Sequence, residues 1–115
     1  MRRMPTAIDF SDISFSRTAW LFEGGKQTDV SIFLVRTPPG GGVGLHVHPY
    51  AETFVLLEGH GRWTVGDETL ELQAEQIVVV PPETPHGFEN TSEGPLLVVS
   101  VHDSGTMRQT FLEED

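Results

Sequence analysis

The sequence contains no cysteine. Disulfide bonds, thiolate catalysis and cysteine-ligated zinc are therefore excluded, and any metal site has to use nitrogen and oxygen ligands. Basic residues are also scarce, because 7 lysines and arginines stand against 17 aspartates and glutamates, for a formal net charge of −10. An acidic chain repels phosphate backbones, so we expect no nucleic-acid partner.

Long hydrophobic runs are missing as well. The longest, such as residues 77–80 and 96–99, are only a few residues long, so we expect no membrane span. The first five residues carry positive charge, but they lead to Asp9 and Asp12 rather than to an apolar segment. They do not resemble a signal peptide, and we expect a cytoplasmic location.

What the chain has instead is many short apolar segments separated by glycine and proline. Its length of 115 residues predicts a single domain over residues 1–115. The segments predict strands at about 18–23, 29–36, 43–48, 52–58, 62–66, 69–72, 76–80, 86–90 and 96–102. Gly66-Asp67 is expected to form a tight turn, and only residues 106–113 are expected to form a short helix. No helical segment separates the strands, so the sequence predicts an all-β sandwich or barrel.

A group of histidines and one glutamate stands out in this pattern. His46 and His48 are two residues apart in an expected strand, so their side chains share one face. Glu52 follows at the start of the next strand, and His86 could close the group from a neighbouring strand. Isolated histidines are usually surface or turn residues, but this set suits one divalent ion of Fe, Mn, Ni, Zn or Cu.

The segment around these residues resembles the first motif of the cupin superfamily, which reads G-x5-H-x-H-x3–4-E-x6-G. Gly40, His46, His48, Glu52 and Gly59 occupy its positions. On composition alone, this pattern would arise by chance in roughly 2 of 10,000 such chains.

The second cupin motif, G-x5-P-x-G-x2-H-x3-N, is matched in part. Pro81, His86 and Asn90 have the right spacing, whereas Glu75 and Glu83 replace the two glycines. The resemblance covers about residues 29–102, and the 15 residues between the motifs are similar to the spacing in small microbial cupins of the cupin-2-like kind.

This resemblance implies a double-stranded β-helix, the jelly-roll barrel of cupins. It also implies that His46, His48, Glu52 and His86 ligate one divalent metal ion, with positions left open for oxygen or substrate if six ligands are preferred. Cupins are commonly dimers, so we expect a homodimer. The strand at 29–36 is apolar on both faces, and either a partner subunit or the same chain could cover one of them.

Phe54 and Phe88 lie two residues after Glu52 and His86. In regular strands they would point toward the metal and line a substrate pocket, although plain core packing is an equal alternative. The Gly40-Gly41-Gly42 segment lacks the lysine of a phosphate-binding loop and is interpreted as a turn, as are Gly59 and Gly61, for which we expect positive φ.

Several polar residues have a functional and a plain alternative. His60 and His102 could transfer protons near the metal, but solvated positions are favoured. Tyr50 is expected to point outward from its turn. Arg36 and Arg62 could bind an anionic substrate, with surface salt bridges favoured.

Two functions share the predicted site. The first is a metal-dependent enzyme, dioxygenase-like or an isomerase or decarboxylase, acting on a small molecule. No separate general base is evident, which is compatible with metal-centred chemistry, and the catalytic residues are unknown. The second is a non-catalytic module that binds or senses a small ligand and uses the metal structurally.

Overall fold

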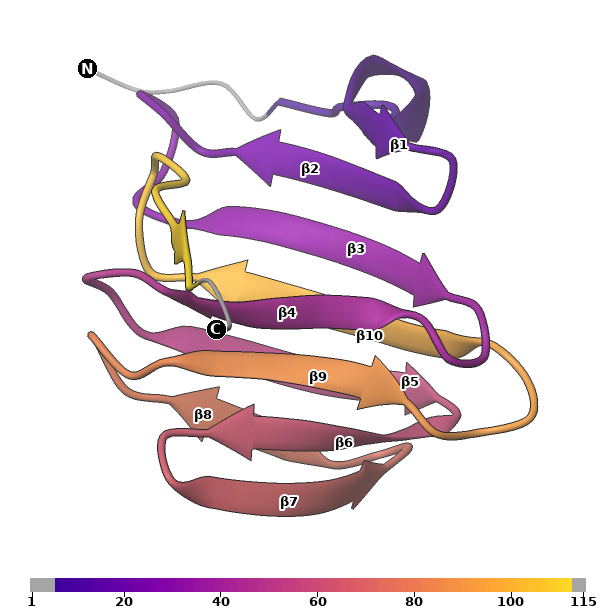
Figure 1. The fold of residues 1–115 in the computed structure, drawn as a ribbon. Helices are drawn as coiled ribbons and strands as arrows, with labels where there is room; N and C mark the ends of the chain where they lie inside the picture. The colour runs from indigo at the N-terminus through magenta and orange to yellow at the C-terminus, as the bar shows by residue number, and fades with distance from the viewer. Residues whose placement is uncertain (1–5, 113–115) are drawn as a thin grey trace.

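The computed structural model describes residues 6–112, which form two antiparallel sheets facing each other (Figure 1). The larger sheet has the order β1 (Ser14–Ser16), β2 (Ala19–Glu23), β3 (Ser31–Thr37), β10 (Leu96–His102), β5 (Glu52–Glu58) and β8 (Ile77–Val80). The smaller sheet has the order β11 (Thr110–Phe111), β4 (Gly42–Val47), β9 (His86–Asn90), β6 (His60–Val65) and β7 (Glu68–Gln73). A single turn of 3-10 helix, η1 (Phe10–Asp12), precedes β1.

The all-β prediction is confirmed. Each of the nine expected strands coincides with an observed strand to within two residues at either end. The expected Gly66-Asp67 turn is also present, because β6 and β7 pair up to Val65 and Glu68. Strands β1 and β11 were not expected, since they have only three and two residues and their side chains are exposed.

The predicted helix at 106–113 is wrong over the residues that are described. Thr110 and Phe111 instead pair with β4, and the backbone N–H of Leu112 donates to the carbonyl of Leu45. A local preference for helix is weak in so short a segment, and pairing with the open edge of β4 satisfies the backbone groups better. Residue 113 and the acidic C-terminal end lie outside the described residues, as do residues 1–5. Within the described part, no helix is long and apolar enough to cross a membrane.

Alternating side chains fill the space between the sheets. Along β5 the residues Glu52, Phe54 and Leu56 are buried, and the residues between them are more exposed. The apolar core consists of Phe54, Leu56, Trp63, Val78, Val80, Phe88, Leu96 and Val98. Trp63 and Phe88 stack there with ring centroids 4.7 Å apart. Glu52, the first residue of β5, lies on the same face as Phe54 and Leu56, so the alternation that builds the core also turns Glu52 inward.

Two turns keep the backbone geometry of the second motif without its glycines. Glu75 and Glu83 both adopt positive φ, at 72° and 59°, so glutamates occupy a conformation that normally favours glycine. The expectation of positive φ is correct for Gly59, at 86°, but wrong for Gly61. Gly61 lies within β6, where a Cβ atom would come within 2.7 Å of the carbonyl oxygen of Glu89. Close backbone packing, and not a turn, explains this second glycine.

The two apolar faces of β3 have different environments. Phe33 and Val35 face the interior cavity described below. Ile32 and Leu34 lie against the N-terminal segment, where Ile8 and Ile13 help to line a shallow groove. The same chain thus covers part of the outer face of β3.

Candidate metal centre

The four predicted ligands come together between the two sheets. His46 lies on β4, His48 follows the end of that strand, Glu52 begins β5 and His86 begins β9. All four side chains are buried, and one ligand atom from each lies within 4.8 Å of the others. His46 and His86 are direct cross-strand partners, next to an irregularity in the pairing of β4 with β9. The sheet register, and not chain proximity, therefore brings His86 to the group.

Backbone carbonyl groups fix the orientation of the three imidazole rings. The Nδ1 atoms of His46, His48 and His86 lie 2.9, 2.7 and 2.8 Å from the carbonyl oxygens of residues 44, 50 and 84. Since a carbonyl only accepts, each Nδ1 carries a proton, and a ring in its neutral form then presents an unprotonated Nε2. Such outer hydrogen bonds are typical of histidines that ligate metals.

The inner contacts of Glu52 fit a cation. Its Oε1 atom lies 2.9 Å from Nε2 of both His48 and His86. With protons on Nδ1, each contact joins two acceptors, which is unfavourable unless a positive charge sits among them. Neighbouring ligand atoms that share an ion at roughly 2.0–2.2 Å are themselves about 2.8–3.6 Å apart, from octahedral to tetrahedral geometry. The donor set and its spacing therefore suit a divalent ion held by three nitrogens and one carboxylate.

The electrostatics of the group agree with this donor set. Burial alone would raise the pKa of the Glu52 carboxyl group, but hydrogen bonding to its oxygens outweighs burial, and the contribution of His102 is the largest. The pKa is therefore held well below its ordinary value. Burial lowers the pKa of His46 below its ordinary value. Glu52 is therefore a carboxylate and His46 a neutral imidazole at neutral pH, which are the forms that ligate metals.

A fourth buried histidine contacts the group. His102 is 2% exposed, and its Nε2 lies 3.1 Å from Oε2 of Glu52. Its Nδ1 lies 3.0 Å from the hydroxyl group of Tyr50, which also accepts the backbone N–H of Arg108. The arrangement is consistent if the Tyr50 hydroxyl donates to Nδ1 and the protonated Nε2 of His102 donates to Glu52.

The sequence interpretation of these two residues was wrong. Tyr50 does not point outward, since it is 7% exposed and its ring stacks on His48 at a centroid distance of 4.1 Å. His102 is not solvated, because β10 pairs with β5 so that His102 lies opposite Glu52. The alternation along β10 put His102 on the face of Val98 and Ser100, but only the register of the two strands reveals its partner.

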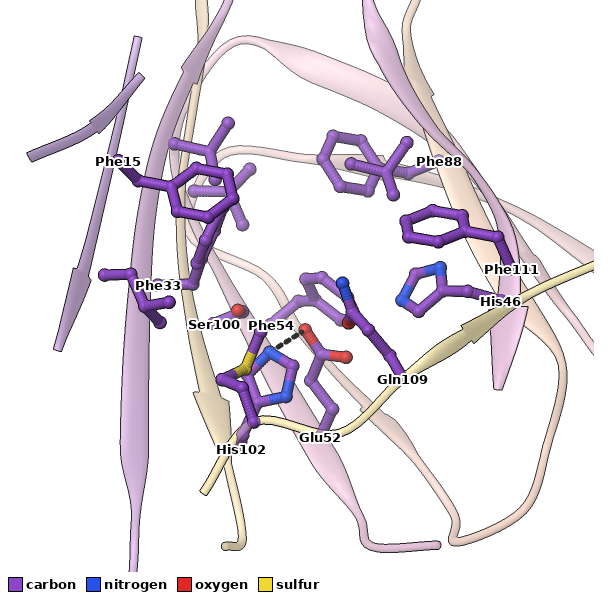
Figure 2. Close-up of a pocket in the computed structure, with 15 residues that line it drawn as sticks. Phe15, Phe33, His46, Glu52, Phe54, Phe88, Ser100, His102, Gln109 and Phe111 are labelled. Carbon is purple, nitrogen blue, oxygen red and sulfur yellow. Dashed lines mark ion pairs between the residues drawn. The ribbon is translucent and has the colours of Figure 1, made fainter. Parts of the chain in front are cut away.

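A cavity of about 420 Å³ adjoins the ligand group. Figure 2 shows Glu52 and His102 at one end of this cavity and phenylalanine rings along its two sides. Phe54 and Phe88 line it, as do His46 and Gln109. Phe54 and Phe88 also belong to the apolar core, so the same two rings pack in the core and line the cavity; that this cavity receives a substrate stays a prediction.

The remaining candidates lie away from the cavity. His60 is exposed and contacts the hydroxyl group of Thr91. Arg62 forms the favoured surface salt bridge, with Nε 2.7 Å from a carboxylate oxygen of Glu71. Arg36 is exposed on β3. None of these three side chains lines the cavity among the described residues.

Comparisons with known proteins agree with the fold and the motifs. An uncharacterized protein of Methanocaldococcus jannaschii is 32% identical over 80 residues, covering 69% of this chain and 62% of that protein. The chain thus spans less than two thirds of this relative.

Two solved structures share the fold. A Klebsiella pneumoniae protein with a double-stranded β-helix domain has a TM-score of 0.76 and 21% identity, covering 96% of this chain and all of that one. Bacillus subtilis oxalate decarboxylase, which has Mn(II) centres, has a TM-score of 0.76 and 23% identity, covering 85% of this chain and 29% of its own. These likenesses confirm the double-stranded β-helix.

The family model of the cupin domain matches residues 33–102, which include both predicted motifs and all four candidate ligands. The chain is a member of the cupin family.

Proposed function

We propose that this cupin is a metal-dependent enzyme that acts on a small molecule, as a dioxygenase-like enzyme, an isomerase or a decarboxylase. One divalent ion would be held by His46, His48, Glu52 and His86. The observation that carries this proposal is the position of the group at one end of an open cavity of about 420 Å³. A metal that only stabilised the barrel would need no such access, since structural sites are closed.

The residues around the site have distinct roles in this proposal. A bound divalent ion would act as a Lewis acid toward an oxygen atom of the substrate. The carbonyl groups that accept from Nδ1 keep the three rings aimed inward. His102 holds the Oε2 atom of Glu52, which leaves Oε1 to face the ligand group. Phe54 and Phe88 form part of the apolar wall of the cavity, which would limit the contact of a bound substrate with water.

The donor set suits Fe, Mn, Ni, Zn or Cu. Manganese is the first ion to test, because Bacillus subtilis oxalate decarboxylase shares this fold and has Mn(II) centres. Iron(II) is the second, because the dioxygenase-like alternative needs an ion that reacts with oxygen.

The alternative is a module that binds or senses a small ligand without converting it, with the metal in a structural role. One observation favours it. Besides the predicted ligands, His102 has the only titratable side chain among the described residues that line the cavity, and both its nitrogens already have partners. Outside the ligand group, the described residues that line the cavity therefore include no general base without a hydrogen-bond partner.

Turnover in defined metal forms separates the two functions. Protein loaded with Fe(II) or Mn(II) is mixed with candidate diketones, catechols and thiols, and both oxygen uptake and product formation are measured. We expect substrate-dependent turnover that falls at least about 100-fold in Glu52→Gln, since this carboxylate is one of the four ligands. The matched control is His60→Ala, which removes an exposed imidazole and should leave the rate unchanged.

Two results would count against the enzyme. One is a rate equal to that of the wild type in Glu52→Gln. The other is a bound ligand that changes the spectrum of the metal but is recovered unaltered, which would establish the binding module instead.

A further inference from the structure

We propose that the ligand of this cavity is a neutral, largely aromatic molecule with one oxygen-bearing edge, and not a small anion. This inference rests on the proposed metal centre and specifies the class of substrate that the centre would receive. Four properties of the cavity carry it: its aromatic walls, its missing cations, its size and its exposed mouth.

Aromatic side chains dominate the walls. Five of the seven phenylalanines of the chain line this one cavity, namely Phe15, Phe33, Phe54, Phe88 and Phe111. They come from five different strands of both sheets. The rings of Phe15 and Phe33 meet edge to face at 5.1 Å, and those of Phe54 and Phe88 meet in the same way at 5.9 Å. Aromatic rings prefer edge-to-face and offset stacked contacts, so the rings that line the cavity favour a flat aromatic ligand in the space between the two pairs.

Aliphatic side chains extend this apolar surface, and the lining includes those of Leu21, Val35, Val43 and Val98. Polar groups are confined to one end. Figure 2 shows His46, Glu52, His102, Ser100 and Gln109 below the rings of Phe15 and Phe88. A ligand that matches this division has an apolar body and a single polar edge directed at Glu52.

Cations are missing from the lining. No lysine or arginine is among the described residues that surround the cavity, whereas Glu52 brings a buried negative charge. Arg62, one of the two arginines in the middle of the chain, is paired on the surface with Glu71. A dianion such as oxalate would have to leave water beside the Glu52 carboxylate with only the metal to compensate it. A neutral ligand avoids this cost.

The size and the mouth of the cavity agree with a larger apolar ligand. A volume of about 420 Å³ falls within the range of about 300–1,000 Å³ that small-molecule sites usually have, and oxalate would leave most of it empty. At the mouth, Phe15 is 62% exposed and Phe111 is 56% exposed. A bound aromatic ligand would cover both rings and gain the free energy of removing them from water.

Isothermal titration calorimetry with two probes tests the inference. The probes are 2,3-dihydroxynaphthalene, which is aromatic with one oxygen-bearing edge, and oxalate. In Mn(II)-loaded protein without free metal, we expect the naphthalenediol to bind at least about tenfold more tightly. Phe15→Ala and Phe111→Ala should each weaken its binding about tenfold, because each removes an aromatic wall.

The matched control is Phe10→Ala. Phe10 is 53% exposed, slightly less than the two mouth residues, but it lines the groove on the outer face of β3. This variant should bind the naphthalenediol as the wild type does. All three phenylalanines are largely exposed, so the variants are expected to fold, and circular dichroism checks that they do.

The outcomes separate this inference from the metal centre. Mn(II) uptake is measured first, without any organic ligand, and absence of uptake would reject the proposed function. In that case 2-naphthol fluorescence in metal-free protein tests the cavity, and weaker binding by Phe15→Ala and Phe111→Ala would support it. If Mn(II) binds but oxalate binds as tightly as the naphthalenediol, the inference is overturned and the metal centre stands. Wild-type affinity in both phenylalanine variants would also overturn it.

Discussion

At the scale of single residues, Glu52 uses its two carboxylate oxygens for different partners. Oε1 faces the Nε2 atoms of His48 and His86, whereas Oε2 faces Nε2 of His102. Tyr50 in turn holds the other nitrogen of His102. This chain of contacts makes His102 a positioning residue for the carboxylate of Glu52. Tyr50 sets which nitrogen of the His102 ring carries the proton.

We therefore predict that His102→Ala lowers the affinity for Mn(II) about 10–100-fold, because the carboxylate loses the donor that orients it. His102→Gln keeps an N–H donor within reach of Glu52 and should recover part of this affinity. Competition with a fluorescent chelator measures both values. A loss in His102→Ala that His102→Gln does not reduce at all would contradict a positioning role, and His60→Ala is the matched control for removing an imidazole.

The same residues show how far sequence reasoning about the site could go. His46, His48, Glu52 and His86 were identifiable because the two motifs place them at fixed spacings. Tyr50 and His102 were not, because each reaches the site through long-range structure. His102 depends on the register between β10 and β5, and Tyr50 depends on a turn whose direction the sequence does not specify.

At the scale of secondary-structure elements, the strands were predictable from alternation and from the turn residues between them. The shortest were not. Strand β11 has two residues and exists because β4 offers an open edge, a condition that no local window of the sequence contains. Phe54 and Phe88 were predicted to line a pocket, but Phe15, Phe33 and Phe111 were not, because these rings meet only when both sheets are assembled.

The turn before β9 provides a prediction at this scale. Glu83 is exposed and has a φ of 59°, which costs an L-residue other than glycine roughly 1–2 kcal/mol. Glu83→Gly removes this cost but adds about 0.5–1 kcal/mol of backbone entropy to the unfolded chain. We expect a net gain of about 0.5–1 kcal/mol in the free energy of unfolding, measured by urea denaturation.

The control for this substitution is Glu93→Gly, at another exposed glutamate, which lies in the loop between β9 and β10 and has no positive φ. It should lose stability, because it gains flexibility and relieves no strain. A Glu83→Gly protein as destabilised as Glu93→Gly would show that Glu83 is not strained, and that the glutamate is a neutral replacement for the motif glycine.

At the scale of the whole molecule, the expected homodimer stays a prediction. Part of the outer face of β3 is covered by the N-terminal segment, so this strand no longer requires a partner subunit. Three large apolar side chains remain exposed on β5 and β8, namely Leu57, Ile77 and Val79, with exposed fractions of 52, 61 and 59%. Strand β8 is also an edge of the larger sheet, where a second copy could approach.

We predict that the protein sediments with twice the mass of the 12.7 kDa chain and that Ile77→Lys shifts it toward the monomer. Analytical ultracentrifugation measures both. A monomeric wild-type protein would reject the dimer, and a dimeric Ile77→Lys would reject this interface. Ile8→Lys, at 38% exposure over the outer face of β3, is the control for placing a charge on another apolar surface.

The central claim is that three imidazoles and one carboxylate hold a divalent ion between the sheets, and metal content tests it most directly. Inductively coupled plasma mass spectrometry is applied to protein purified without added metal and without chelators. The account predicts about one divalent ion per wild-type chain, about one in His60→Ala, and well below one in folded His86→Ala and Glu52→Ala. Metal-free wild-type protein that also fails to take up Mn(II) or Fe(II), or full metal content in both ligand variants, would contradict it.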